Sequence, residues 1–272
     1  MIYSVYGGTG FVGGNFCNKF PNNIIKQGRE ERIPNTKNLL YFISTTHNYN
    51  VHTNITLDTE TNLKIFCEVL DHCRSSEYTI NYISSWFVYG DGPLPARESD
   101  KCEPTGFYSI TKKAAEDLLI SFCKTYDVNY RILRLCNVLG KGDGKASAQK
   151  NALTYMIDLL KNNEDVYLYD SGTAYRDVMH VNDVCEAIEL VCREGNLNEI
   201  YNIGSGQPTR VSDIISKAKE YLGSTSNILS KPTPEFHKIV QTESFWMDTS
   251  KLKGLGFSQE ISNDLIIQEL CQ

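Results

Sequence analysis

The sequence predicts a doubly wound α/β fold, in which helices cover both faces of a mainly parallel β-sheet, with a smaller, mainly C-terminal second domain. Short runs rich in β-branched and aromatic residues alternate along the chain with segments whose apolar residues recur at helical spacing. The first such run leads straight into a glycine cluster that precedes a helical segment. This alternation is typical of βαβ units, whose strands pair in parallel.

The strands are expected where apolar runs of four to seven residues are too short for a buried helix and rich in Val, Ile, Leu, Tyr or Phe. In chain order they are Met1–Tyr6, Asn23–Gln27, Leu39–Ile43, Thr79–Ser85, Tyr130–Leu135, Val166–Tyr169 and Ile200–Ile203.

The helices are expected where apolar residues recur every three or four positions, and the first of them stops at Pro21. In chain order they are Phe11–Phe20, Asn54–Cys73, Tyr108–Tyr126, Asn151–Lys161, Val181–Cys192 and Val211–Leu222. The pattern loosens after Gly144 and becomes irregular after Leu222. We therefore expect one domain from residues 1–143, to which 177–205 return, and a second mainly from residues 144–272.

The composition excludes several function classes. The 272 residues carry a net charge of −6 with no basic tract, so neither nucleic acid nor a membrane surface is an expected partner. No apolar run approaches the roughly 20 residues of a membrane span. The nine cysteines and five histidines lack metal-ligand spacing, which indicates buried thiols in a reducing cytoplasm and no metal. No signal peptide is expected, because the first predicted strand begins at Met1.

The glycine cluster points to a dinucleotide. It follows a strand and opens a helix, where glycines allow a tight turn and let a pyrophosphate approach the backbone and the helix N-terminus. The expected cofactor contacts are Gly7, Gly8, Thr9, Gly10, Phe11, Val12 and Gly13. The second strand ends without a carboxylate, and Arg29 follows it at the spacing where an arginine accommodates a 2′-phosphate. NADP(H) is therefore favoured, with NAD(H) as the alternative.

A catalytic set is expected on one helix and one strand end. Tyr108 and Lys112 form the only Tyr-x-x-x-Lys in the chain, and four residues apart on a helix they share a face. A nearby ammonium lowers the pKa of a phenol toward neutrality, where it works as an acid or base. Ser84 and Ser85 end a predicted strand upstream, where a hydroxyl can polarise a substrate oxygen.

Together these pieces resemble the extended short-chain dehydrogenase/reductases, in particular the NAD-dependent epimerase/dehydratase group that acts on nucleotide sugars, over nearly the whole chain. The resemblance implies a Rossmann-type cofactor domain, with Tyr108, Lys112 and Ser85 catalytic and Ser85 also touching the substrate. It places Ser44 and Thr45 beside the cofactor, at the end of the strand Leu39–Thr45.

Later motifs of the chain resemble those that bind the sugar nucleotide. Asn137, in Arg134-Leu-Cys-Asn137, is implied to approach the substrate diphosphate, and Arg176 is implied to grip it. For Arg176 the alternative is a structural pair with Asp177 or Asp183. Lys238 stands where the family tends to place a second phosphate-binding arginine, and a lysine there keeps the charge but loses the bidentate fork.

Two departures from the family pattern matter. The chain between the second strand and Leu39 is short, so a helix and a strand with an adenine-contacting acidic residue are expected to be missing. The sugar 4,6-dehydratases place an Asp-Glu pair after the catalytic hydroxyl, whereas this chain has Trp86 and Phe87, which cannot move protons. Elimination of water is therefore not expected.

The expected activity is NADPH-dependent reduction of a 4-keto-6-deoxy NDP-hexose at C4, with an NDP-hexose 4-epimerase as the alternative. A non-catalytic NADP-sensing protein and a reductase of non-sugar carbonyls are further alternatives. The family also implies a homodimer through the helices at Asn54–Cys73 and Tyr108–Tyr126. Their apolar residues lie on more than one face: Leu63, Ile65, Phe66, Leu70, Leu118, Leu119 and Phe122.

Overall fold

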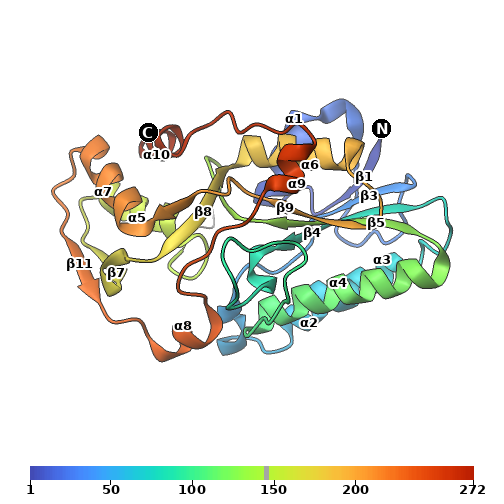
Figure 1. Ribbon diagram of the computed structural model, residues 1–272, viewed down its shortest axis with the longest axis horizontal. Helices are drawn as coiled ribbons and strands as arrows, with labels where there is room; N and C mark the ends of the chain where they lie inside the picture. Colours follow the sequence, from blue (N-terminus) through green and yellow to red (C-terminus); the bar gives the residue numbers. More distant parts are fainter. Residues whose placement is uncertain (144–146) are drawn as a thin grey trace.

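The computed structural model describes residues 1–143 and 147–272, so residue 144, the expected start of the second domain, lies outside the described residues. Six parallel strands form the large sheet, in the order β2-β1-β3-β4-β5-β9 (Figure 1). Their bounds are β1 Tyr3–Tyr6, β2 Ile24–Lys26, β3 Asn38–Tyr41, β4 Thr79–Ser85, β5 Asn129–Leu135 and β9 Glu199–Ile203. The doubly wound parallel fold predicted from the sequence is confirmed.

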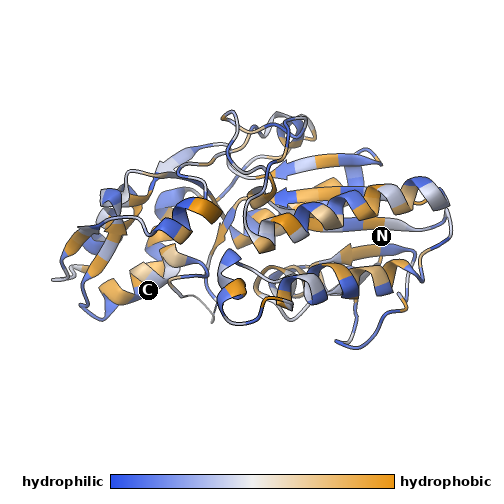
Figure 2. Cartoon of the chain, turned by 90° about the horizontal axis from the view of Figure 1, so that it is seen from below, coloured by the Kyte–Doolittle hydropathy of each residue, from blue (hydrophilic) through white to orange (hydrophobic). Residues whose placement is uncertain are grey.

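Helices cover both faces of this sheet because its strands are apolar on both sides. Val5 packs in the cluster of α1 (Phe11–Lys19) and α6 (Val181–Glu194), while Tyr6 packs in the cluster of α3 (Ile65–Leu70) and α4 (Phe107–Tyr126). Figure 2 shows the apolar colouring concentrated on the strands and on the helices beside them. Side chains therefore alternate between two cores, as the strand period of two requires.

A second lobe lies beyond the carboxyl ends of these strands (Figure 1). It contains a three-stranded sheet, β10-β8-β6, and the parallel pair β11-β7. The strands are β6 Asn137–Leu139, β7 Val166–Tyr169, β8 Tyr175–His180, β10 Pro208–Arg210 and β11 Ile228–Lys231. Its helices are α5 Ala152–Lys161, α7 Val211–Leu222, α8 Glu235–Val240 and α10 Asn263–Cys271. α9 (Ser250–Gly254) packs instead against β9 of the large sheet, where Leu252 joins the cluster of α1 and α6. α5, α7 and α10 share a third apolar cluster.

Most predicted elements are present within a few residues of their expected bounds. The helix expected over Asn54–Cys73 is built from α2 (Leu57–Thr59), a π-helical turn η3 (Glu60–Lys64) and α3. The sequence did not predict β6, β8, β10, β11, α8, α9 or α10, because these elements are short or lie in the tail that lacks a clear apolar period.

The shortened segment after the second strand leaves β2 at the edge of the sheet, paired only with β1. Residues 27–37 form no helix or strand before β3 begins. The prediction that a helix and a strand are missing here is therefore correct. Among the described residues, no helix combines the length and apolar character needed to cross a bilayer.

Candidate active site

A cleft of about 1570 Å³ separates the carboxyl ends of the large sheet from the second lobe. Open α/β sheets bind ligands at this edge. The cleft brings together most of the site residues expected from the sequence, which are Gly7, Thr9, Gly10, Phe11, Val12, Gly13, Ser44, Thr45, Ser85, Tyr108, Lys112, Asn137, Arg176 and Lys238. Gly8 and Arg29 are the two expected residues that do not line it.

The glycine turn fits a dinucleotide pyrophosphate. Gly7 has a φ of +82°, and a Cβ on Gly13 would meet the Gly7 carbonyl oxygen at 2.4 Å, so neither position accepts a side chain without a shift. Gly10 caps α1 without a side-chain hydrogen bond, and the first helical turn has no acidic residue. The free N–H groups at this helix start are therefore available to an anion.

Ser85 and Tyr108 meet at the centre of the cleft. Ser85 ends β4, and its hydroxyl accepts a hydrogen bond from the Phe87 backbone N–H at 3.4 Å. Tyr108 stands in the first turn of α4 and is 7% exposed. Burial raises the pKa of Tyr108, while the nearby hydroxyls of Ser85 and Ser44 oppose that rise. The phenol is therefore protonated at neutral pH and can donate a proton.

Lys112 lies one turn along α4 from Tyr108 and is 1% exposed. Its ammonium donates to the Ile83 carbonyl oxygen at 2.7 Å and lies 4.1 Å from the centre of the Tyr82 ring. Burial lowers the pKa of Lys112 to about 7, although Glu116 raises it. Burial is the largest influence on the pKa of each group, so the lowering of the Tyr108 pKa by Lys112 remains a prediction.

A buried ion pair supports this part of the site from below. Arg134 on β5 donates to both carboxylate oxygens of Glu116, at 3.0 and 2.7 Å, and the two side chains are 2% and 1% exposed. The Ser84 hydroxyl donates to the same carboxylate at 2.5 Å. Glu116 thus joins α4 to strands β4 and β5 directly beneath Ser85 and Lys112.

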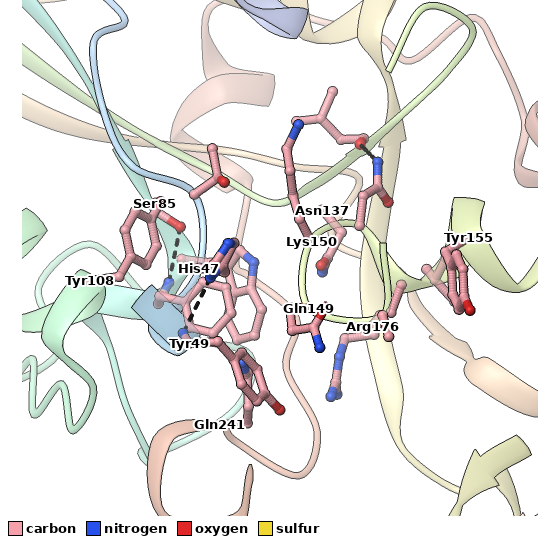
Figure 3. A pocket seen from close by; sticks show the side chains of 18 of the residues that line it. His47, Tyr49, Ser85, Tyr108, Asn137, Gln149, Lys150, Tyr155, Arg176 and Gln241 are labelled. Carbon is pink, nitrogen blue, oxygen red and sulfur yellow. Dashed lines mark hydrogen bonds between the residues drawn. The ribbon is translucent and has the colours of Figure 1, made fainter. Parts of the chain in front are cut away.

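The opposite wall of the cleft carries Arg176 and Asn137 (Figure 3). Arg176 donates to the carbonyl oxygens of Tyr175 and Glu243 at 2.8 and 2.7 Å, and among the described residues no carboxylate lies within ion-pair distance. Burial lowers the pKa of Arg176 to about 10. Asn137 donates to the Asp177 carbonyl oxygen at 3.1 Å. The charge of Glu243 raises the Arg176 pKa in opposition to burial, although among the described residues Arg176 forms no ion pair. The carbonyl contacts, which include Thr242 at 3.4 Å, orient the guanidinium in the cleft.

The structural alternative for Arg176 does not hold. Asp177 accepts hydrogen bonds from the backbone N–H groups of Ser205, Gly206 and Met247. Asp183 accepts one from the Ile261 N–H. Neither carboxylate pairs with Arg176, so the guanidinium is available to an anionic ligand.

Two lysines add charge at this wall. Lys238 lines the cleft but pairs with Glu235 at 2.7 Å and is half-exposed, which weakens the case for it as a phosphate contact. Lys150 also lines the cleft, where it pairs with Asp143 at 2.8 Å. No motif surrounds Lys150, so it was not predicted as a site residue.

The tip of β2 differs from expectation. Arg29 is exposed, while Arg32 pairs with Glu68 at 2.7 Å. The Glu31 carboxylate folds back and accepts the Gly28 N–H at 2.7 Å. The expectation that this tip carries no carboxylate is therefore wrong: Glu31 reaches it from three residues further along the chain.

A polar network that the sequence analysis missed holds the loop after β3. Asn62, in the π-helical turn η3, accepts the Thr45 N–H at 2.8 Å and donates to the Thr111 hydroxyl on α4 at 2.9 Å. Asp58 on α2 accepts from Thr45 and from Asn50. Asp58 and Asn62 are each 1% exposed. Polar residues at core-facing positions of the predicted helix are the signal that could have found them.

Trp86 and Phe87 follow Ser85 and form an apolar wall. Their rings stack at 3.9 Å, and Phe87 meets Tyr108 edge-on at 5.7 Å. The Arg176 guanidinium lies 5.9 Å from the Trp86 ring centre. The positions beside Ser85 therefore carry aromatic surface and no proton-transfer group.

Comparison with known proteins identifies the family of this chain. Residues 36–204 match the model of the "NAD dependent epimerase/dehydratase family". A putative UDP-glucose 4-epimerase of Methanocaldococcus jannaschii is 30% identical over 178 residues, 64% of this chain and 55% of that protein. The chain spans about half the length of the curated relatives it matches.

Two solved structures share the fold. The UDP-glucose 4-epimerase of Thermotoga maritima with UDP-glucose has a TM-score of 0.87 at 21% identity, covering 100% of this chain and 97% of that one. RMD from Pseudomonas aeruginosa, complexed with NADPH, has a TM-score of 0.84 at 19% identity, covering 99% and 97%.

Proposed function

Because this chain belongs to the NAD dependent epimerase/dehydratase family, we propose that it is an NADPH-dependent reductase that acts at C4 of a 4-keto-6-deoxy NDP-hexose. The observation that carries the proposal is one cleft holding the glycine turn, the set of Ser85, Tyr108 and Lys112, and Arg176, which forms no ion pair among the described residues.

The proton chemistry follows from the protonation state of Tyr108. A bound nicotinamide cofactor would supply the hydride. The Tyr108 phenol, kept protonated by burial, gives its proton to the C4 oxygen. Ser85 donates a hydrogen bond to the same oxygen as negative charge develops there. Lys112 would hold the ribose of that cofactor, with its ammonium turned to the ribose from the Ile83 carbonyl oxygen.

The diphosphate provides binding energy away from the reacting carbon. Arg176 binds it with charge-assisted hydrogen bonds, and Asn137 lies beside it, with Lys238 as a weaker contact. Fixing the diphosphate places the sugar against Tyr108 and Ser85, so remote contacts orient the reacting carbon. Trp86 and Phe87 offer no proton acceptor, and this argues against a dehydratase.

The open cofactor end favours a reductase over an epimerase. A reductase must release its oxidised cofactor after every turnover, whereas an epimerase returns the hydride and keeps the cofactor. β2 lies at the sheet edge, and residues 27–37 form no helix or strand. Less protein therefore covers the adenine end of a bound cofactor than the family pattern provides. Easier exchange of the cofactor suits a reductase.

The choice of cofactor depends on charges at the tip of β2. The positive charge of Arg29 favours NADPH, whereas the negative charge of Glu31 favours NADH.

An NDP-hexose 4-epimerase is the second candidate. It is favoured by the relative from Methanocaldococcus jannaschii, which is named a putative UDP-glucose 4-epimerase. A purely cofactor-sensing protein would need the glycine turn but not a proton donor, so the presence of Tyr108 beside Ser85 argues against it. A reductase of non-sugar carbonyls would have no use for Arg176.

Stoichiometry separates the two candidates. Supplied with a 4-keto-6-deoxy NDP-hexose, the reductase consumes one NADPH per sugar, seen as loss of absorbance. An epimerase changes the configuration of an NDP-hexose with no net loss of reduced cofactor. Tightly bound NAD in the purified protein, with no NADPH consumed by any keto sugar, would overturn the reductase and leave the epimerase.

A further inference from the structure

His47 is held in one tautomer by the backbone. It caps the short 3-10 helix η2 (Asn48–His52), and its Nδ1 accepts the Tyr49 N–H at 3.2 Å. A neutral imidazole has one acceptor nitrogen and one N–H, so the hydrogen must reside on Nε2. The side chain therefore presents a fixed donor on the far side of the ring from the backbone.

His180 has the same capping geometry but no open donor. Its Nδ1 accepts the Asn182 N–H at 3.1 Å, its Nε2 lies 3.2 Å from Glu269, and it is 2% exposed. His47 differs from His180 in its burial and in the contacts of its Nε2. It is only partly buried and lines the cleft, and no residue in the described ranges lies within hydrogen-bond distance of its Nε2.

The loop that carries His47 is tied beside the catalytic set. The Ser44 hydroxyl, three residues earlier, lies close enough to Tyr108 to lower its pKa and donates to Asn62 at 3.1 Å. Asn62 also accepts the Thr45 N–H. Asn50 donates to the His47 carbonyl oxygen at 3.1 Å. Figure 3 shows His47 on the Ser85 and Tyr108 side of the pocket, with Lys150 and Asn137 across from it.

Burial favours the neutral form of His47. Burial lowers its pKa, Asp58 on α2 raises it, and Lys150 from the opposite wall lowers it. A neutral imidazole at pH 7 retains the Tyr49 contact, since protonation would place a second N–H against the Tyr49 N–H. The open position is thus a neutral donor suited to a hydroxyl or carbonyl oxygen rather than to a phosphate.

We propose that His47 is a specificity-determining residue, whose Nε2–H donates a hydrogen bond to an oxygen of the hexose of the nucleotide-sugar substrate. The proposal rests on the proposed function and assigns to this chain a sugar contact outside the Ser85, Tyr108 and Lys112 set. The diphosphate lies with Arg176, so His47 should sense the sugar and not the nucleotide.

The test compares a nucleotide sugar with its own diphosphate. Calorimetry measures the affinity of UDP-glucose, dTDP-glucose and GDP-mannose and of free UDP, dTDP and GDP, and the nucleotide bound most tightly is carried forward. His47→Asn keeps a capping side chain for η2 but removes the imidazole donor. It should lower the affinity for the nucleotide sugar about 10-fold and leave that for the diphosphate unchanged.

Two control variants show whether the effect of His47→Asn is specific to the sugar. Arg176→Ala should weaken the diphosphate and the nucleotide sugar alike. His180→Asn, which alters the other histidine cap, should leave both affinities at the wild-type values. Equal losses of diphosphate and nucleotide sugar in His47→Asn, no loss at all, or weaker binding of NADPH alone would each overturn the proposal. If the wild type binds none of the three diphosphates, the proposed function falls, and this proposal with it.

Discussion

At the residue scale, the chemistry depends on how burial sets the protonation of two side chains on α4. The spacing of Tyr108 and Lys112 predicts that they share a helix face, and they do. The sequence could not predict their charge states, because those depend on the strands packed against them. Tyr82 and Ile83, on β4, provide the ring and the carbonyl that meet Lys112.

Tyr108→Phe should lose turnover by at least about 10²-fold, the scale of positioned acid–base catalysis, because the ring remains while the proton donor is removed. NADPH affinity should remain within about two-fold, since the phenol is not expected to contact the phosphates. Steady-state kinetics and fluorescence titration measure the two quantities. A Phe variant with near-normal kcat would show that another group moves the proton.

Lys112→Met should stabilise the protein at pH 7, because a buried ammonium without a paired carboxylate is removed. The pKa of Lys112 is about 7 in the folded chain, against about 10.4 when unfolded. Between these values the unfolded chain binds more protons, so the free energy of unfolding of the wild type rises with pH. The variant should gain about 3 kcal/mol at pH 7 and almost nothing above pH 10.

Urea denaturation of wild type and Lys112→Met at pH 7 and pH 10 checks this difference. Lys124→Met, an exposed lysine on the same helix, should change the free energy of unfolding little at either pH. An equal gain for Lys112→Met at both pH values would mean that the ammonium is not destabilised by burial.

At the element scale, the sequence predicted the regular βαβ part well and the second lobe less well. The apolar runs and the glycine turn identified β1 to β5 and the helices between them, since each is long or sharply bounded. β6, β8 and β10 are three- to six-residue strands whose pairing joins segments distant in the chain. Their side chains alone carry no period from which such a sheet could be inferred.

The loop after β2 shows the same limit of sequence-based prediction at the cofactor-binding end of the cleft. The absence of a carboxylate within the strand was read correctly, but Glu31 returns to Gly28 through a turn that strand spacing does not reveal. The cofactor preference expected from Arg29 is therefore opposed by a nearby negative charge.

Glu31→Gln should raise the affinity for NADPH several-fold and leave that for NADH nearly unchanged. The amide oxygen can still accept the Gly28 N–H, while the charge that repels a 2′-phosphate is removed. Arg29→Ala should lower NADPH affinity about 10-fold, which brings the two cofactors close to parity. Fluorescence titration with both cofactors measures these ratios. If neither variant alters the NADPH to NADH ratio, the 2′-phosphate binds elsewhere.

At the scale of the whole molecule, the buried apolar side chains gather in three clusters, but one face of α4 keeps large apolar side chains exposed. Of the apolar residues expected at a dimer contact, Phe66, Leu70 and Leu119 are buried in the core, so they cannot take part. Leu118 is 42% exposed and aligns with Phe107 and Ile110, which are 40% and 46% exposed, on one stripe of α4.

We expect this stripe to pair with its copy across a two-fold axis, because three large apolar side chains in line would otherwise face water. Leu118→Glu places a charge in the middle of the stripe and should convert a dimer to a monomer in light scattering at micromolar concentration. Lys124→Glu, near the end of the same helix and outside the stripe of Phe107, Ile110 and Leu118, should stay dimeric. Since α4 also carries Tyr108 and Lys112, the monomeric variant should retain its cofactor site. A wild type that is already monomeric would mean that the stripe has another role.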